Sequence, residues 1–209
     1  MIGKYIVIEG QDGTGKSTQV QLLVDYFRGL GVKVVVFEEP GGSPSTDVIR
    51  KLLKTKHYQL DGLTNVLLFS AARRELWTKI GQPTIDGGGV VIVARNWWST
   101  LAYQHFGQGV SRQLIEQTTA EFLPERYVKP DVGIILTLPD KKRAQRLRGR
   151  GGSSKDSFES RGRDFQDKVN AGYLEIAGQY DTAVIDASPK PDKIHQEILK
   201  IIIKSLLLS

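Results

Sequence analysis

The sequence predicts a protein of the α/β class, built on a parallel sheet of about five strands with helices on both faces. Two observations lead to this prediction. Short, nearly continuous apolar runs alternate with longer segments in which apolar residues recur at helical spacing. The apolar runs also lack the polar alternation of a strand with one face in water, so both faces of the sheet should be covered. With 209 residues the chain can form one substantial core, and we expect a single domain over residues 1–209.

Five segments have the length and apolar character of buried strands. They lie at residues 5–9, 32–37, 90–93, 132–138 and 183–186. Helical patterns occupy residues 16–29, 45–54, 63–79, 98–122, 139–148, 160–180 and 191–207. Strands separated by helices in this way pair in parallel, because each helix carries the chain back to the starting end of the sheet. The carboxyl ends of the strands should therefore meet at one edge, where open sheets bind ligands.

Composition and charge argue against several other classes of protein. The chain has no cysteine, which rules out disulfides and thiolate metal sites and fits a reducing compartment such as the cytoplasm. Residues 1–4 lead directly into a strand, so we expect no signal peptide. The apolar segment 198–208 is interrupted by Lys200 and Lys204 and is too short to span a bilayer, so we expect no membrane association. The net charge of +6 comes from basic residues beside turns, which favours small phosphate compounds over nucleic acid as partners.

A phosphate-binding motif follows the first predicted strand. Its sequence, Gly10-Gln-Asp-Gly-Thr-Gly15-Lys16-Ser17, fits the P-loop pattern G-x-x-x-x-G-K-[ST] and lies between a strand and a helix. Its glycines let backbone N–H groups turn toward a phosphate, and the helix N-terminus adds the positive end of its dipole. The sequence therefore predicts a P-loop NTPase fold that binds ATP. The expected ATP-binding residues are Gly10, Gln11, Asp12, Gly13, Thr14, Gly15, Lys16, Ser17 and Thr18.

Two residues of this motif have expected chemical roles. Lys16 should contact the β- and γ-phosphates, and the Ser17 hydroxyl should bind Mg²⁺ as the cofactor of ATP. Further along the chain, a basic, glycine-rich stretch follows the helix after the fourth strand. We expect this stretch to form a short lid at about residues 147–158.

Further motifs occur in a defined order after the P-loop. They are Glu39-Pro40-Gly41-Gly42, Leu68-Phe69-Ser70-Ala71-Ala72-Arg73, Arg95 with Ser99-Thr100-Leu101-Ala102-Tyr103-Gln104, and Asp156-Ser157-Phe158-Glu159 with Val169-Asn170-Ala171-Gly172-Tyr173-Leu174. In this order, from about residue 4 to 188, the chain resembles thymidylate kinases (dTMP kinases). The resemblance implies transfer of the γ-phosphoryl group of MgATP to dTMP, for dTTP synthesis, and a homodimer packed through helices.

The resemblance implies base-reading roles for one group of residues. Phe69 should stack on the thymine ring, while Arg73 and Gln104 hydrogen-bond its edge. Ser99 should lie beside the base, and Tyr103 should pack against C2′ of the sugar. A flat base needs an aromatic face and a few fixed polar groups, so these residue types suit the role.

Phosphate-handling roles are implied for a second group. Arg50 and Arg95 should hold the acceptor phosphate, with Glu39 in the same site, and Asp12 should accept a hydrogen bond from the 3′-hydroxyl. Arginine suits phosphate oxygens because its planar fork donates two parallel hydrogen bonds. The resemblance also implies three residues that contact ATP. Arg146 should lie near the adenine, and Arg148 or Arg150 should close over the phosphates from the lid. The expected catalytic residues are Lys16, Arg95, Arg148 and Arg150.

Two positions depart from the family pattern. Glu38 stands where the family usually has an arginine on the acceptor phosphate, and Ala94 stands where it usually has an aspartate beside the metal. Two alternatives therefore stay open, a kinase for a related nucleotide such as dUMP and a nucleotide-binding protein with little turnover. We expect the Ala94 side chain to face the metal site. Of the other acids at this edge, Glu39 is expected to replace the missing carboxylate in preference to Glu9.

Overall fold

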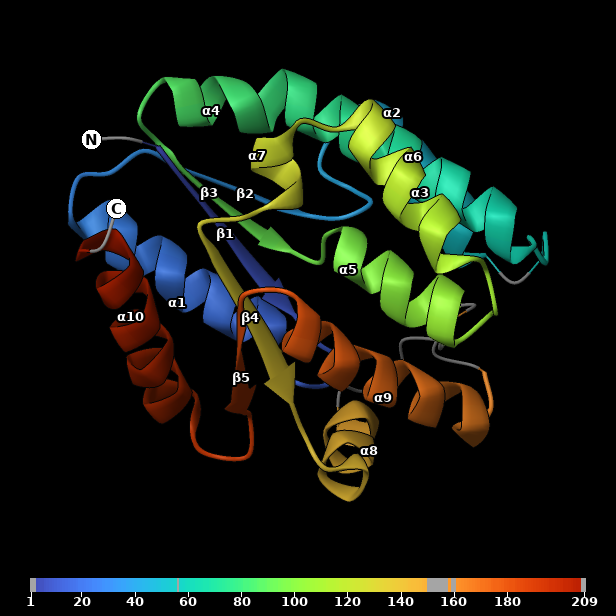
Figure 1. Ribbon diagram of the computed structural model, residues 1–209. Coiled ribbons are helices and arrows are strands. Elements are labelled where there is room, and N and C mark those ends of the chain that lie inside the picture. The colour runs from blue at the N-terminus through green and yellow to red at the C-terminus, as the bar shows by residue number, and fades with distance from the viewer. Residues whose placement is uncertain (1–2, 56, 150–157, 159–160, 208–209) are drawn as a thin grey trace.

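A five-stranded parallel sheet forms the centre of the protein in the computed structural model, which describes residues 3–55, 57–149, 158 and 161–207 (Figure 1). The strands are β1 (Lys4–Glu9), β2 (Val34–Glu38), β3 (Val90–Ala94), β4 (Val132–Thr137) and β5 (Thr182–Asp186). They are arranged in the order β2-β3-β1-β4-β5, and each adjacent pair is parallel. The predicted α/β class and strand count are confirmed.

Helices cover both faces of this sheet, as Figure 1 shows. On one face, α1 (Lys16–Gly29) and α10 (Pro191–Leu207) pack over an apolar cluster that includes Ile6 and Ile92. On the other, α3 (Gly62–Leu76) and α9 (Arg163–Gln179) contribute to a cluster that includes Tyr5 and Val91. Successive strand residues thus enter opposite clusters, which is why the central strands are continuous apolar runs in the sequence.

The helix predicted at residues 98–122 is wrong as a single element. The chain forms α5 (Trp97–Thr100), a π-helical turn η2 (Leu101–Phe106) and, after a break, α6 (Arg112–Phe122). Gly109 adopts a φ of 76° in the break, and Ser111 caps α6 by accepting a hydrogen bond from the Leu114 N–H. Apolar spacing alone did not reveal this break, because the turn depends on a left-handed glycine and a cap.

The other helices match the prediction more closely. They are α2 (Pro44–Lys54), which begins at a Ser43 cap, and α8 (Asp140–Gly149). The helix predicted at 63–79 continues beyond α3 through a second π-helical turn, η1 (Trp77–Gly81), into α4 (Gln82–Asp86). The short helix α7 (Glu125–Val128) was not predicted. Within the described part of the chain, no helix is long and apolar enough to cross a membrane.

Candidate active site

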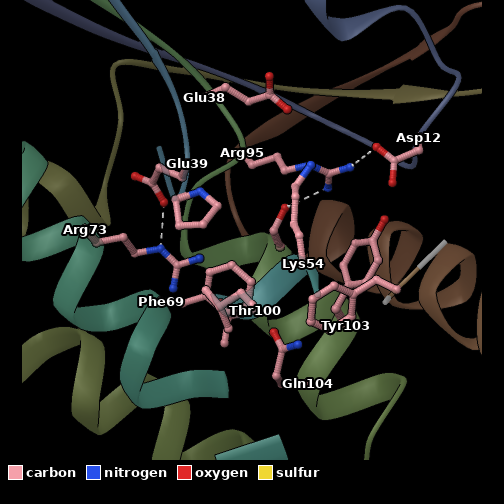
Figure 2. A pocket seen from close by; sticks show the side chains of 14 residues that line it. Asp12, Glu38, Glu39, Lys54, Phe69, Arg73, Arg95, Thr100, Tyr103 and Gln104 are labelled. Atoms are coloured by element: carbon pink, nitrogen blue, oxygen red, sulfur yellow. Dashed lines mark hydrogen bonds and ion pairs between the residues drawn. The ribbon is translucent and has the colours of Figure 1, made fainter. Parts of the chain in front are cut away.

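A cavity opens at the carboxyl edge of the sheet, where the loops after β1, β2 and β3 face α2, α3, α5 and η2 (Figure 2). Its lining residues are Asp12, Glu38, Glu39, Pro40, Leu53, Lys54, Phe69, Arg73, Arg95, Ser99, Thr100, Tyr103, Gln104 and Phe158. Every residue predicted for the acceptor site lines this cavity except Arg50. Figure 2 shows Asp12, Arg95 and Glu38 at one end and Gln104 at the other. The structure therefore brings together residues from segments far apart in the sequence.

The P-loop lies beside this cavity and depends on its glycines. Gly10, Gly13 and Gly15 have φ values of 130°, 88° and 97°, which side-chain-bearing residues rarely adopt. A Cβ atom at Gly10 would also lie 2.3 Å from the Leu136 carbonyl oxygen. Glycine therefore suits all three positions, and at Gly10 a side chain would also clash with the backbone of β4.

Lys16 begins α1 and folds back over the loop that precedes it. Its side chain is buried, and Nζ donates to the carbonyl oxygens of Gly10 at 2.8 Å and Gln11 at 2.9 Å. Burial, and then the charge of Arg95, lower the pKa of Lys16 to about 8, although Asp12 opposes this shift. The ammonium group is thus fixed at the loop and poorly hydrated, where an incoming phosphate would be a strong partner.

Arg95 and Asp12 form an ion pair at the end of the cavity next to the P-loop. Arg95 Nη2 lies 2.5 Å from Asp12 Oδ1, and the guanidinium lies 5.3 Å from the centre of the Tyr103 ring. Burial alone would raise the pKa of the Asp12 carboxyl, but Arg95 and then Lys16 hold it well below its usual range. The backbone of Arg95 has a φ of 71°, a strained conformation for an arginine. This turn aims the side chain back toward the P-loop.

A second ion pair lies at the end of the cavity beside Phe69. Arg73 Nε donates to Glu39 Oε2 at 2.7 Å, and the Tyr127 hydroxyl donates to Glu39 Oε1, also at 2.7 Å. Arg73 Nη2 donates to the Asn96 carbonyl oxygen at 2.9 Å, and the guanidinium lies 5.4 Å from the centre of the Phe69 ring. The pair thus fixes one face of Arg73 and leaves Nη1 unused among the described residues.

Neither candidate for the missing carboxylate is available to a metal site. Both oxygens of Glu39 are engaged as described, and burial raises the pKa of its carboxyl to about 7. Glu9 is fully buried and accepts hydrogen bonds from the backbone N–H groups of Asn96 and Ser99 and from the Tyr173 hydroxyl. The prediction that Glu39 serves the metal is therefore wrong, because its charge is used to position Arg73.

Polar side chains of α5 and η2 complete the cavity wall. The Ser99 hydroxyl donates to the buried carboxylate of Glu9 at 2.8 Å. The next residue, Thr100, is 1% exposed, and its hydroxyl has no partner in the structure as described. The side-chain amides of Gln104 and Gln108 are in hydrogen-bond contact at 3.0 Å. Thr100 and Gln104 therefore offer the polar atoms that a ligand could use.

On the opposite side of the P-loop, Arg146 connects two strand ends. It donates to the carbonyl oxygens of Ala187 at 2.8 Å and Thr14 at 3.4 Å, so it lies where the loops after β1 and β5 meet. Arg148 is exposed at the end of α8. Arg150 and most of the predicted lid lie outside the described residues.

Several cavity residues were not predicted as site residues. Lys54 comes from the last turn of α2, and Leu53 and Pro40 lie nearby in the lining. The Phe158 ring lies 6.1 Å from that of Phe69 and 5.9 Å from that of Tyr103. A lysine near the end of a helix is an ordinary solvated residue in sequence, so only the tertiary structure reveals that Lys54 faces the cavity.

Comparison with known proteins identifies the family. The thymidylate kinase family model matches residues 8–198. This chain belongs to the thymidylate kinase family. It is 37% identical over 203 residues to the thymidylate kinase of Caldicellulosiruptor saccharolyticus, covering 97% of each chain, and 34% identical over 207 residues to that of Ruegeria pomeroyi, covering 98% and 96%. The crystal structure of thymidylate kinase from Ehrlichia chaffeensis matches with a TM-score of 0.77 at 32% identity, covering 96% of this chain and 98% of that one.

The two departures from the thymidylate kinase pattern lie next to each other. Glu38 and Ala94 are directly paired across β2 and β3. Arg50 donates to the Glu38 carbonyl oxygen at 2.9 Å, and its Nη2 lies 3.3 Å from Glu38 Oε1. Arg50 thus contacts Glu38, which lines the cavity, but is not itself among the lining residues.

Proposed function

We propose that this member of the thymidylate kinase family transfers the γ-phosphoryl group of ATP to dTMP, giving dTDP for dTTP synthesis. The observation that carries the proposal is the continuity of the cavity. Its base-binding end holds Phe69 and Arg73, and its other end holds Arg95 beside the P-loop lysine, Lys16. A nucleoside monophosphate that lies along the cavity places its phosphate toward the P-loop.

The base-binding end suits thymine better than cytosine. Phe69 offers an aromatic face, and the unused Nη1 of Arg73 can donate to a ring carbonyl oxygen such as O4. Thr100 or Gln104 can accept from the ring N3–H. Cytosine has an amino group in place of O4 and no N3–H, so both contacts would be lost and buried polar groups would stay unpaired.

The sugar-binding region favours a deoxyribose. Tyr103 is 7% exposed and packs against the rings of Phe158 and Tyr173. We propose that this ring lies against C2′, where an added hydroxyl would have to enter an apolar, filled space. Such a hydroxyl would lose its hydration without gaining a partner.

Phosphoryl transfer then depends on charges that the free protein already holds in place. We propose that the acceptor phosphate replaces Asp12 as the partner of Arg95, which frees the Asp12 carboxylate to accept from the 3′-hydroxyl. Lys16 neutralises charge on the transferred group, and Arg148 or Arg150 closes over it from the lid. Mg²⁺, held by the Ser17 hydroxyl, would supply further neutralisation of the ATP phosphates. Ser17 fits this role because it is exposed on the first turn of α1, and its hydroxyl has no partner among the described residues.

A homodimer is also proposed, packed through α3 and α6. These two helices contact each other, and they leave large apolar side chains exposed: Leu63, Leu67, Leu114 and Phe122. An apolar face of this kind is typical of an interface. Light scattering after size-exclusion chromatography should give twice the mass of one chain, whereas a monomer would contradict this part of the proposal.

An ADP-release assay across nucleoside monophosphates tests the proposed reaction. With ATP and Mg²⁺ present, dTMP should give the highest kcat/KM, with dUMP lower and dCMP and ribonucleotides far lower. A preference for dUMP would favour the related-nucleotide alternative. Binding of both nucleotides without ADP release would favour a nucleotide-binding protein.

A further inference from the structure

A second cavity lies on the other face of β2 and β3, between these strands and α1. It has a volume of about 260 Å³, and its lining residues are Ser17, Val20, Gln21, Val24, Arg28, Val36, Glu38 and Ala94. Four of these residues are apolar, and the other four are polar or charged. Among the polar ones, Ser17 comes from the P-loop and Glu38 from the end of β2, so a hydroxyl-bearing and a carboxylate-bearing residue line the same cavity.

The strand register explains why Glu38 and Ala94 share this cavity. They are paired residues of adjacent parallel strands, so their side chains emerge on the same face of the sheet. Ala94 belongs to the apolar cluster on the α1 side, together with Val20 of α1. Ala94 lines the same cavity as Ser17, but its methyl group can accept no hydrogen bond. That the Ala94 side chain faces the metal stays a prediction.

Glu38 carries the carboxylate that reaches this cavity. Its side chain is 46% exposed, and Arg50 contacts one oxygen, Oε1. In the described chain, Oε2 has no partner. Glu9 and Glu39, by contrast, are buried and committed to neighbouring donors, as the active-site geometry shows. Glu38 thus supplies a carboxylate oxygen with no partner among the described residues, in a cavity that Ser17 also lines.

The electrostatic field of Glu38 also reaches the P-loop. Burial and Arg95 lower the pKa of Lys16, and Glu38 is one of three carboxylates, with Asp12 and Glu9, whose charge opposes that shift. Hydroxyl and carboxylate oxygens are the ligands and hydrogen-bond acceptors that suit Mg²⁺ and its bound waters. The donor set beside Ser17 therefore fits the divalent ion that accompanies ATP.

We propose that Glu38 is a positioning residue for the metal, accepting hydrogen bonds from water bound to Mg²⁺ at Ser17. In this chain the acid stands one strand along the sheet, at the end of β2 in place of the end of β3, on a side chain one methylene longer than that of aspartate. This inference rests on the proposed function, because it assumes that MgATP binds at the P-loop. On this proposal, Glu38 takes over the role of the aspartate that the family usually has at the position of Ala94.

Metal affinity tests this role without requiring turnover. Mn²⁺ serves as the probe, with free ion measured by electron paramagnetic resonance, and the protein is saturated with the β,γ-imido analogue of ATP. The acceptor nucleotide is omitted, so that changes in acceptor binding do not contribute. Glu38→Gln should weaken Mn²⁺ binding by about 10- to 100-fold, the usual effect of losing an outer-shell partner.

Two further variants show whether Mn²⁺ affinity depends on where the carboxylate lies or only on the net charge of the protein. Glu197→Gln removes one negative charge from the exposed surface of α10 and should leave Mn²⁺ affinity unchanged. Adding Ala94→Asp to Glu38→Gln should restore most of the lost affinity, because a carboxylate then returns to the same cavity from β3. Equal losses in Glu197→Gln and Glu38→Gln would overturn the proposal, as would a failure of Ala94→Asp to restore binding.

A double-mutant cycle excludes an indirect effect through Arg50. Loss of the Glu38 charge leaves the Arg50 guanidinium unpaired, and that cation could itself repel a metal. Glu38→Gln should therefore weaken Mn²⁺ binding to a similar extent in the Arg50→Gln background. If its effect disappears there, Glu38 acts only on Arg50 and the proposal is wrong. Binding of the ATP analogue is followed in parallel, since a wild-type protein that does not bind it would contradict the proposed function itself.

Discussion

The Arg73 guanidinium and the Glu39 carboxylate form a buried ion pair, with 2.7 Å between Nε and Oε2, that joins α3 to the end of β2. Both side chains are at most 3% exposed. The pair lies at the end of the cavity beside Phe69, so it orients the arginine that we propose to read thymine. A buried charge of this kind is costly unless it is paired.

Replacement of Glu39 should therefore destabilise the fold. Glu39→Ala should lower the free energy of unfolding by about 3–5 kcal/mol at pH 8, because it leaves the Arg73 charge buried and unpaired. Glu39→Gln should cost less, since its amide oxygen can still accept one of the two hydrogen bonds. Urea unfolding of the three proteins measures the difference. A loss below about 1 kcal/mol in Glu39→Ala would show that water reaches Arg73.

The same carboxyl should titrate near neutral pH. Burial raises the pKa of Glu39 from 4.5 to about 7, against the opposing effect of Arg73. Between these pH values the folded state keeps a proton that the unfolded state has released. The stability of the wild type relative to Glu39→Gln should therefore fall as pH rises from about 4.5 to about 7. Unfolding curves at several pH values test this, and a constant difference would contradict it.

Lys16 should be required for phosphoryl transfer but not for folding. Lys16→Ala removes the ammonium that neutralises charge on the transferred group, so kcat should fall by at least 10³-fold, about 4 kcal/mol in the barrier. Circular dichroism should show an unchanged fold. Retention of more than about a tenth of the wild-type kcat would mean that the P-loop does not hold the reacting phosphate in this way.

ATP affinity should also depend on the protonation of Lys16. Its pKa in the free protein is lowered to about 8, chiefly by burial. Only the charged form attracts phosphate, so ATP binding should weaken as pH rises through about 8, and the Lys16→Ala variant should lack this dependence. Calorimetric titration between pH 6.5 and 9.5 would measure it. A binding constant that does not change over this range would contradict the assignment.

Base selectivity should depend on the two polar groups of α5 and η2. Gln104→Ala and Thr100→Val should each raise KM for dTMP and narrow its advantage over dCMP, because a site that hydrogen-bonds its substrate rejects analogues that leave its groups unpaired. Each variant should cost about 1–3 kcal/mol in kcat/KM for dTMP. Kinetic parameters for both nucleotides provide the measurement. If neither variant alters the ratio of kcat/KM for dTMP to kcat/KM for dCMP, the base is read by other residues. Arg73→Ala is then the deciding variant.

Local sequence patterns were sufficient to predict the sheet and the P-loop. Continuous apolar runs such as β1 and β3 are determined by burial on both faces, and Gly10, Gly13 and Gly15 are determined by positive φ values within the loop itself. Both features depend on neighbouring residues along the chain. By contrast, the break after η2 depends on Gly109 and a Ser111 cap, and apolar spacing across residues 98–122 does not report it.

The sequence by itself determined the chemistry available at the carboxyl edge, because each strand end contributes its residues to the same edge of a parallel sheet. Only the tertiary structure decided how the charges there are used. Glu39 and Glu38 are adjacent in sequence, yet one is buried with Arg73 and the other is exposed beside Arg50 and Ala94. The physical reason is that successive residues at a strand end point to opposite faces, so their partners come from helices that are distant in sequence.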